Sequence, residues 1–258
     1  MKSRKPKKKV IVTLPAYKAE STLKRTVDDI PMDYVDQIIL VDDASPDNTA
    51  KLSKELGLIT IVHEKNLGYG GNQKTCYMNA LNMGADIVVC LHPDYQYSPR
   101  MIPSLIEPLL VERADFTFGS RWKDGGQPLK GGMPFYRYIG NILTTKIENY
   151  FLGTNFSEMH SGLKAYTREF LLSVPFLSYS DDFFFDTQIL FNAILFGFRI
   201  EEVAIPTRYT LDSSSTSISA SFKYIYVSIK YAWRVKKDSS GEIDRLRKLS
   251  DEFNRKHL

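Results

Sequence analysis

Short β-branched runs alternate with segments of helical pattern through the first half of the chain, and this alternation leaves few possible folds. Strands that alternate with crossover-length helices pack as a mostly parallel sheet with helices on both faces, so we expect an α/β domain. The predicted strands are residues 9–14, 37–41, 58–63 and 86–91, and the predicted helices are residues 19–30, 49–56 and 71–83.

The second half of the chain continues this alternation less regularly, and a segment with amphipathic helical periodicity lies near its end. Apolar side chains recur every three or four residues from Ile218 to Trp233, and Lys223, Lys230 and Arg234 lie off that stripe. The repeat fits a helix at a membrane interface, and it fits equally a terminal helix packed on the core. The other predicted elements are strands at residues 114–119 and 199–206 and helices at residues 134–152 and 182–196.

Basic residues gather at the N-terminus. Six of the first nine residues are Lys or Arg, and the rest of the chain carries 28 basic and 30 acidic residues. Such an arm binds anionic lipid or nucleic acid, or is a solvated tail. We expect no nucleic-acid partner, because no aromatic residues are interleaved with the lysines. We divide the chain into an arm (1–8), a domain (9–235) and a charged C-terminal segment (236–258) that is either a helix or a frayed tail.

The composition excludes several classes of protein. With 258 residues, 43% hydrophobic and 25% charged, the chain is globular rather than disordered or built on disulfides. Cys76 and Cys90 lie in apolar segments without metal-ligand spacing, which predicts buried thiols in a reducing compartment. No apolar run reaches the about 18 residues of a membrane span, and the N-terminus lacks the apolar stretch of a secretory signal. We expect a cytoplasmic protein that meets a membrane only at its cytosolic face.

Candidate functional residues follow three of the predicted strands. They lie in the segments LPAYKAESTL, LVDDASPDNT and CLHPDYQYSP, which begin at residues 14, 40 and 90. Each segment by itself is typical of a turn or a helix cap. In a parallel α/β sheet, ligands bind beyond the carboxyl ends of the strands, so we expect the three segments to line one crevice.

In this order, these segments resemble glycosyltransferase family 2, specifically its dolichyl-phosphate mannosyltransferase-like branch with a GT-A, Rossmann-like fold. The resemblance covers roughly residues 8–235 and is supported by NLGYGGNQKTC, GSRW, HSGLKAYTREFL, FFFDTQIL and GFRIEEVAIPTRY further along. It implies an enzyme that uses a nucleoside-diphosphate sugar. The segment NLGYGGNQKTC lacks the spacing of a P-loop, so we do not interpret it as one. No dinucleotide-binding fingerprint follows the first strand, which argues against a dehydrogenase.

The resemblance also implies donor and metal sites. The family's metal motif is Asp-x-Asp followed by Gln, and the matching positions here are His92, Asp94 and Gln96. A histidine at the first position suits Mn²⁺ better than Mg²⁺, or it does not touch the metal. With the metal, Asp94 would stabilise the departing diphosphate. The residues that the resemblance implies in donor binding are Pro15, Tyr17, Glu20, Asp42, Asp43 and Asp94. Two residues before Glu20, where the family usually has Asn, this chain has Lys18.

On the acceptor side, the resemblance implies a polyprenyl phosphate held by arginines. Arg121 and Arg137 match the family's phosphate-binding positions, and Arg208 is a third candidate. A phosphate monoester is already nucleophilic at neutral pH, so an inverting direct displacement needs no protein base. If the acceptor is instead a saccharide hydroxyl, Asp182 or Asp186 would be the base. The alternatives are therefore a transferase for surface polysaccharide and, because His92 departs from the motif, an inactive nucleotide-sugar-binding partner protein. The sequence does not choose between uridine and guanosine donors.

Overall fold

The structure is a computed structural model that describes residues 8–125, 128–206 and 218–257, without the side chains of residues 218–224 and 253–257. Its centre is a seven-stranded sheet in the order β3-β2-β1-β4-β6-β5-β7. All strand pairings are parallel except those of β6 with β4 and β5. The strands are β1 (Val10–Ala16), β2 (Gln37–Asp42), β3 (Ile59–Val62), β4 (Ile87–Cys90), β5 (Phe116–Ser120), β6 (Lys164–Thr167) and β7 (Ile200–Ala204).

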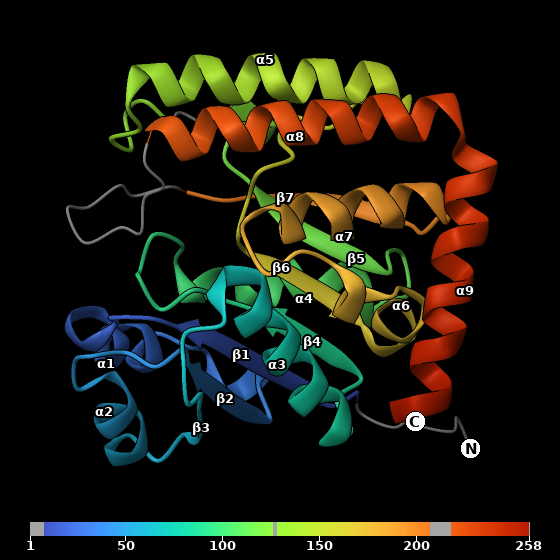
Figure 1. The fold of residues 1–258 in the computed structure, drawn as a ribbon. Coiled ribbons are helices and arrows are strands. Elements are labelled where there is room, and N and C mark those ends of the chain that lie inside the picture. Colours follow the sequence, from blue (N-terminus) through green and yellow to red (C-terminus); the bar gives the residue numbers. More distant parts are fainter. Residues whose placement is uncertain (1–7, 126–127, 207–217, 258) are drawn as a thin grey trace, which may run out of the picture.

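Both faces of the sheet are buried under helices, so the predicted α/β architecture is confirmed (Figure 1). Alternate residues of a strand point to opposite faces. Ile11 of β1 accordingly packs in one hydrophobic core and Val12 in the other. The helices are α1 (Glu20–Asp28), α2 (Thr49–Glu55), α3 (Gly68–Asn82), α4 (Ile102–Leu110), α5 (Phe135–Leu152), α6 (Arg168–Ser173), α7 (Phe184–Leu195), α8 (Ile218–Lys237) and α9 (Ser239–His257).

The last two helices both pack on the core, and contact of α8 with a membrane stays a prediction. In α8, Tyr231, Ala232 and Val235 are buried in the core, whereas Tyr226 and Trp233 are about half exposed or more. Helix α8 lies alongside α5 at one side of the molecule (Figure 1). The charged C-terminal segment is the helix α9 rather than a frayed tail, and its Leu246 packs in the same core.

Two further sequence expectations concern cysteines and membrane spans. Cys76 and Cys90 are buried and free, as predicted. Within the described parts of the chain, no helix combines the length and the apolar character needed to cross a membrane.

Candidate active site

A cavity of about 500 Å³ opens at the carboxyl ends of β1, β2 and β4, where the sequence predicted a shared crevice. The N-terminus of α3 and the residue before α7 complete its wall. It is lined by Pro15, Ala16, Tyr17, Lys18, Ala19, Ser21, Thr22, Asp43, Asn66, Gly68, Tyr69, Asn72, His92, Pro93, Asp94 and Phe183.

The three loops that follow these strands each contain a residue in the left-handed backbone region. These are Lys18, Ala44 and Tyr95, with φ of 55°, 56° and 57°. Non-glycine residues rarely adopt this conformation, so surrounding contacts must hold it in place. The backbone N–H of Lys18 donates to Oγ of Ser45 at 2.9 Å. The ring of Tyr95 lies 3.9 Å below the guanidinium of Arg25.

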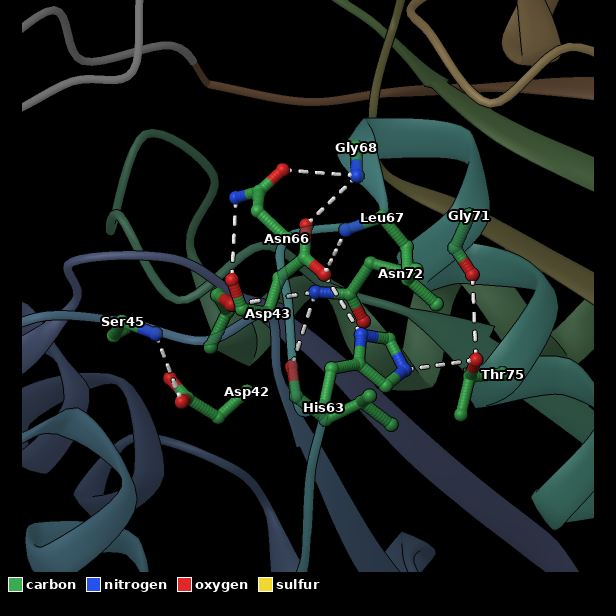
Figure 2. A network of polar contacts seen from close by, with 12 residues as sticks. Asp42, Asp43, Ser45, His63, Asn66, Leu67, Gly68, Gly71, Asn72 and Thr75 are labelled. Atoms are coloured by element: carbon green, nitrogen blue, oxygen red, sulfur yellow. Dashed lines mark hydrogen bonds and ion pairs between the residues drawn. The ribbon is translucent and has the colours of Figure 1, made fainter.

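Asp43 lies at the cavity wall with its carboxylate tied to the start of α3 (Figure 2). Its Oδ1 lies 2.7 Å from Nδ1 of His63 and accepts from the backbone N–H of Leu67 at 2.8 Å. Its Oδ2 accepts from the N–H of Gly68 at 3.0 Å. The partial positive charge at the N-terminus of a helix favours a carboxylate at this place. Oδ1 is thus fully engaged, and Oδ2 keeps acceptor capacity for a ligand.

Two other residues expected to bind the donor do not line the cavity. Asp42 is 1% exposed, and its Oδ2 accepts from the backbone N–H of Ser45, which fits the turn interpretation of this segment. Glu20 accepts from the backbone and side-chain N–H groups of Asn48 at 3.0 and 2.9 Å. Pro15 and Tyr17 do line the cavity, and Tyr17 is 50% exposed.

His92 and Asp94, the first two positions of the expected metal motif, both line the cavity. Oδ1 of Asp94 accepts from the backbone N–H of Gln96 at 3.0 Å, and the Gln96 side chain is not part of the cavity wall. No group of three or more His, Cys, Asp or Glu side chains in the described part of the chain is arranged to hold a metal ion. A cation bound here would therefore take further ligands from the diphosphate itself.

His92 is connected to Asp186 through Tyr69. Nε2 of His92 lies 3.0 Å from the hydroxyl of Tyr69, which donates to Oδ2 of Asp186 at 2.7 Å. Burial lowers the pKa of His92 against the opposing effect of the Asp94 and Asp186 carboxylates, and the ammonium of Lys164 adds to the lowering. Burial also raises the pKa of Tyr69 well above its usual value, and the negative charge of Asp186 adds to this effect. Both side chains are therefore neutral.

Asp186 is buried and saturated with partners. Its Oδ1 lies 2.7 Å from Nζ of Lys164, a lysine whose side chain is only 2% exposed. The same oxygen accepts from Nε2 of Gln73 at 3.1 Å, while Oδ2 accepts from Tyr69. Asp182 does not join this cluster, because its Oδ1 accepts from the backbone N–H of Phe184, where α7 begins. Asp182 thus accepts from a backbone N–H at the start of α7, and Asp186 lies behind the cavity wall.

The three arginines expected at an acceptor phosphate have different surroundings. Arg121 is 4% exposed and forms a buried ion pair with Glu158, and its guanidinium also donates to the backbone oxygen of His160. Arg137 lies on α5 with its guanidinium 5.8 Å from the ring of Tyr136. Arg208 is outside the described residues. Neither Arg121 nor Arg137 lines the described cavity, so the phosphate-binding role of the three arginines stays a prediction.

Sequence reasoning missed cavity residues at the start of α3 and immediately before α7, including Tyr69 and Phe183. The glycines ahead of Asn72 were the available signal. Gly70 donates its N–H to the backbone oxygen of Asp181 at 2.7 Å, and a Cβ at Gly70 would lie 2.2 Å from the backbone oxygen of Ser180. Only glycine permits this approach, which docks α3 against the segment preceding α7.

Residues 11–173 match the family described as Glycosyl transferase family 2. This chain belongs to glycosyltransferase family 2. It is 30% identical over 238 residues to the UDP-N-acetylglucosamine–dolichyl-phosphate N-acetylglucosaminyltransferase of Methanococcus voltae, covering 85% of this chain and 94% of the relative. It is 26% identical over 259 residues to the dolichol-phosphate mannosyltransferase of Pyrococcus furiosus, covering 94% and 67%. The family resemblance and the glycosyltransferase activity expected from the sequence are thereby confirmed.

The fold is also similar to that of solved structures. Glucosyl-3-phosphoglycerate synthase of Mycobacterium tuberculosis, crystallised with Mn²⁺, UDP and phosphoglyceric acid, superposes with a TM-score of 0.68 at 20% identity, covering 88% of this chain and 78% of that chain. The same enzyme has been crystallised with Mg²⁺ and UDP, with a TM-score of 0.65. This family 2 glycosyltransferase is therefore a single α/β domain of GT-A-like fold.

Proposed function

We propose that this glycosyltransferase moves a sugar from a nucleoside-diphosphate donor, UDP-linked by analogy with the Methanococcus relative, to a polyprenyl phosphate by inverting direct displacement. The observation that carries the proposal is that both carboxylate oxygens of Asp186 already have partners. A saccharide hydroxyl acceptor requires a free carboxylate base. Lys164, Gln73 and Tyr69 occupy both oxygens of Asp186 behind the cavity wall. A phosphate dianion attacks without such a base.

The cavity residues suit a nucleotide diphosphate. Tyr17 offers an exposed aromatic face for stacking a base, and Oδ2 of Asp43 offers an acceptor for a base or ribose N–H or O–H group. Asp94, with His92 beside it, would hold a Mn²⁺ or Mg²⁺ ion at the diphosphate. Such an ion, when bound, supplies Lewis-acid neutralisation of the charge that develops on the leaving group. The mixed His and Asp donor set favours Mn²⁺.

The outer surface of α5 and α8 supports contact with a membrane, where a polyprenyl phosphate resides. The two helices pack side by side (Figure 1). Ammonium groups lie over two of the exposed rings, Lys236 over Tyr150 at 4.0 Å and Lys237 over Trp233 at 5.3 Å. Aromatic and cationic side chains together are typical of interfacial helices. The exposed apolar side chains are Phe135, Tyr136, Ile139, Leu143, Ile147 and Tyr150 on α5 and Tyr226 and Trp233 on α8.

Of the basic arm, only Lys8 is described, so the arm adds little to the argument for membrane contact. Residues 1–7 lie outside the described part of the chain. Nζ of Lys8 donates to the backbone oxygen of Leu109 at 3.1 Å and lies 3.7 Å from Glu112, so this lysine packs against the end of α4. The proposed membrane contact therefore rests on α5 and α8.

The proposal is tested by following the labelled sugar. The protein is incubated with radiolabelled UDP-sugars, Mn²⁺ and vesicles that contain dolichyl phosphate. We expect label in a lipid-extractable product that mild acid releases, and no such product with EDTA. Label appearing solely in a water-soluble glycoside would contradict the proposed acceptor. Equal yield with and without EDTA would contradict the metal.

A further inference from the structure

Tyr69 contacts both His92 at the cavity and Asp186 of the buried Lys164–Asp186 pair. It lies in the first turn of α3, and its ring is nearly parallel to that of His92, with centroids 5.1 Å apart. Its hydroxyl meets Nε2 of His92 at 3.0 Å and Oδ2 of Asp186 at 2.7 Å. Neither the family match nor the expected metal motif assigns this residue a role.

The network fixes where the proton of each group resides. Oδ1 of Asp186 forms an ion pair with Nζ of Lys164 at 2.7 Å, and Oδ2 accepts from the hydroxyl of Tyr69. A carboxylate only accepts hydrogen bonds, so the single hydroxyl proton of Tyr69 points to Asp186. The hydroxyl oxygen of Tyr69 is then left as an acceptor toward His92. Nε2 of His92 must therefore carry its proton, and Nδ1 carries the lone pair of the neutral ring.

The packing around His92 shows which edge of the ring is left for a ligand. A Cβ at Gly162 would lie 3.1 Å from Cδ2 and 3.4 Å from Nε2, so that edge is covered by the backbone of the segment leading into β6. Nε2 is also taken by Tyr69. Among the described residues, Nδ1 has no hydrogen-bond partner, and His92 belongs to the cavity wall. The Nδ1 edge is thus the edge available to the cavity.

We propose that Tyr69 is a positioning residue that holds His92 as the Nε2–H tautomer, so that Nδ1 faces the donor diphosphate and its cation as a neutral acceptor. This proposal rests on the proposed function for the identity of the ligand, but the tautomer itself does not depend on it. Outer hydrogen bonds of this kind orient metal-binding histidines and raise their basicity, and their loss costs about 10–100-fold in metal affinity.

The tautomer is tested without any ligand. Long-range ¹H–¹⁵N correlation spectra of the protein distinguish the two neutral tautomers, and the signals of His92 are identified by their absence in His92→Asn. We expect the Nε2–H form in the wild type. In Tyr69→Phe, which removes only the hydroxyl, we expect a mixture of both tautomers. A wild-type Nδ1–H form, or a Tyr69→Phe spectrum identical to that of the wild type, overturns the proposal.

The effect on the ligand is tested by calorimetry with Mn²⁺ and UDP. We expect Tyr69→Phe to weaken binding of UDP in the presence of Mn²⁺ by about 10-fold or more and to leave binding of UDP in EDTA within about twofold. Tyr231→Phe is the matched control, since it removes another buried hydroxyl, bonded to Asn192 at 2.9 Å, away from the cavity. Equal affinities of Tyr69→Phe and the wild type for UDP with Mn²⁺ would overturn the role toward the cation. A wild type that binds no UDP would instead overturn the proposed donor and leave the tautomer result standing.

Discussion

Breaking the buried Lys164–Asp186 pair is expected to destabilise the domain strongly. The two charged atoms lie 2.7 Å apart, and the side chains are 2% and 12% exposed. Asp186→Asn leaves an ammonium unpaired in the interior, and Lys164→Met leaves a carboxylate with only Tyr69 and Gln73 as donors. Removing one partner of a buried ion pair costs about 3–5 kcal/mol. In a chain of this size, that lowers Tm by on the order of 10 °C.

The double variant separates a charge effect from a packing effect. Asp186→Asn with Lys164→Met removes both charges, and the new amide oxygen still accepts from Tyr69. The combined cost should therefore be smaller than the sum of the single costs by about 2–3 kcal/mol. Urea unfolding of the four proteins, followed by far-ultraviolet circular dichroism, measures this coupling energy.

An exposed ion pair supplies the control. Nζ of Lys24 lies 2.7 Å from Oδ2 of Asp28 on α1, with side chains 65% and 56% exposed. The cycle of Lys24→Met and Asp28→Asn should give a coupling of about 0.5 kcal/mol or less, because solvent screens the pair. If the costs at Lys164 and Asp186 simply add, the two groups do not interact as a buried ion pair, and the argument that Asp186 is unavailable as a base fails.

Three further perturbations follow from the structure. Lys18→Asn should raise the free energy of unfolding by about 0.5–1 kcal/mol, because Asn adopts the left-handed conformation more readily than Lys; lower stability in urea would contradict the strain. Leu143→Glu, at a side chain 56% exposed on α5, should reduce cosedimentation with anionic vesicles severalfold, whereas Leu110→Glu, at a side chain 39% exposed on α4, should not; equal losses would exclude α5 as the docking element. Asp94→Asn should abolish any strengthening of UDP binding by Mn²⁺ in calorimetry, and persistence of that strengthening would place the cation elsewhere.

Periodicity sufficed to predict the architecture, since parallel strands buried on both faces are long β-branched runs. It failed at β6, which has four residues, runs antiparallel and contains a fully buried lysine. Lysines are almost never buried without a partner, and the partner of Lys164 lies on α7, beyond the reach of any local pattern. The start of α3 at Gly68 was also predicted three residues late, because three of its first four residues are glycines.

The sequence predicted only part of the site, because only some of its residues are placed by local patterns. Strand ends in a parallel sheet meet at one edge, so Asp43, His92 and Asp94 could be placed together from their positions alone. The sequence could not predict which of the two adjacent aspartates faces the cavity. Successive residues at the end of β2 point to opposite sides, and Asp42 turns toward Ser45. Tyr69 could not be found either, because its partners His92 and Asp186 are brought together only by the docking of α3 on α7.

The acceptor is tested most directly by comparing dolichyl phosphate with dolichol of the same chain length, under identical vesicle conditions and with the same labelled UDP-sugar. The two acceptors share the lipid and differ only in whether a phosphate or a hydroxyl attacks. If Asp186 is unavailable as a base, label is transferred to dolichyl phosphate and transfer to dolichol is lower by about 10²-fold or more, the usual contribution of a general base. Comparable transfer to both would contradict the account.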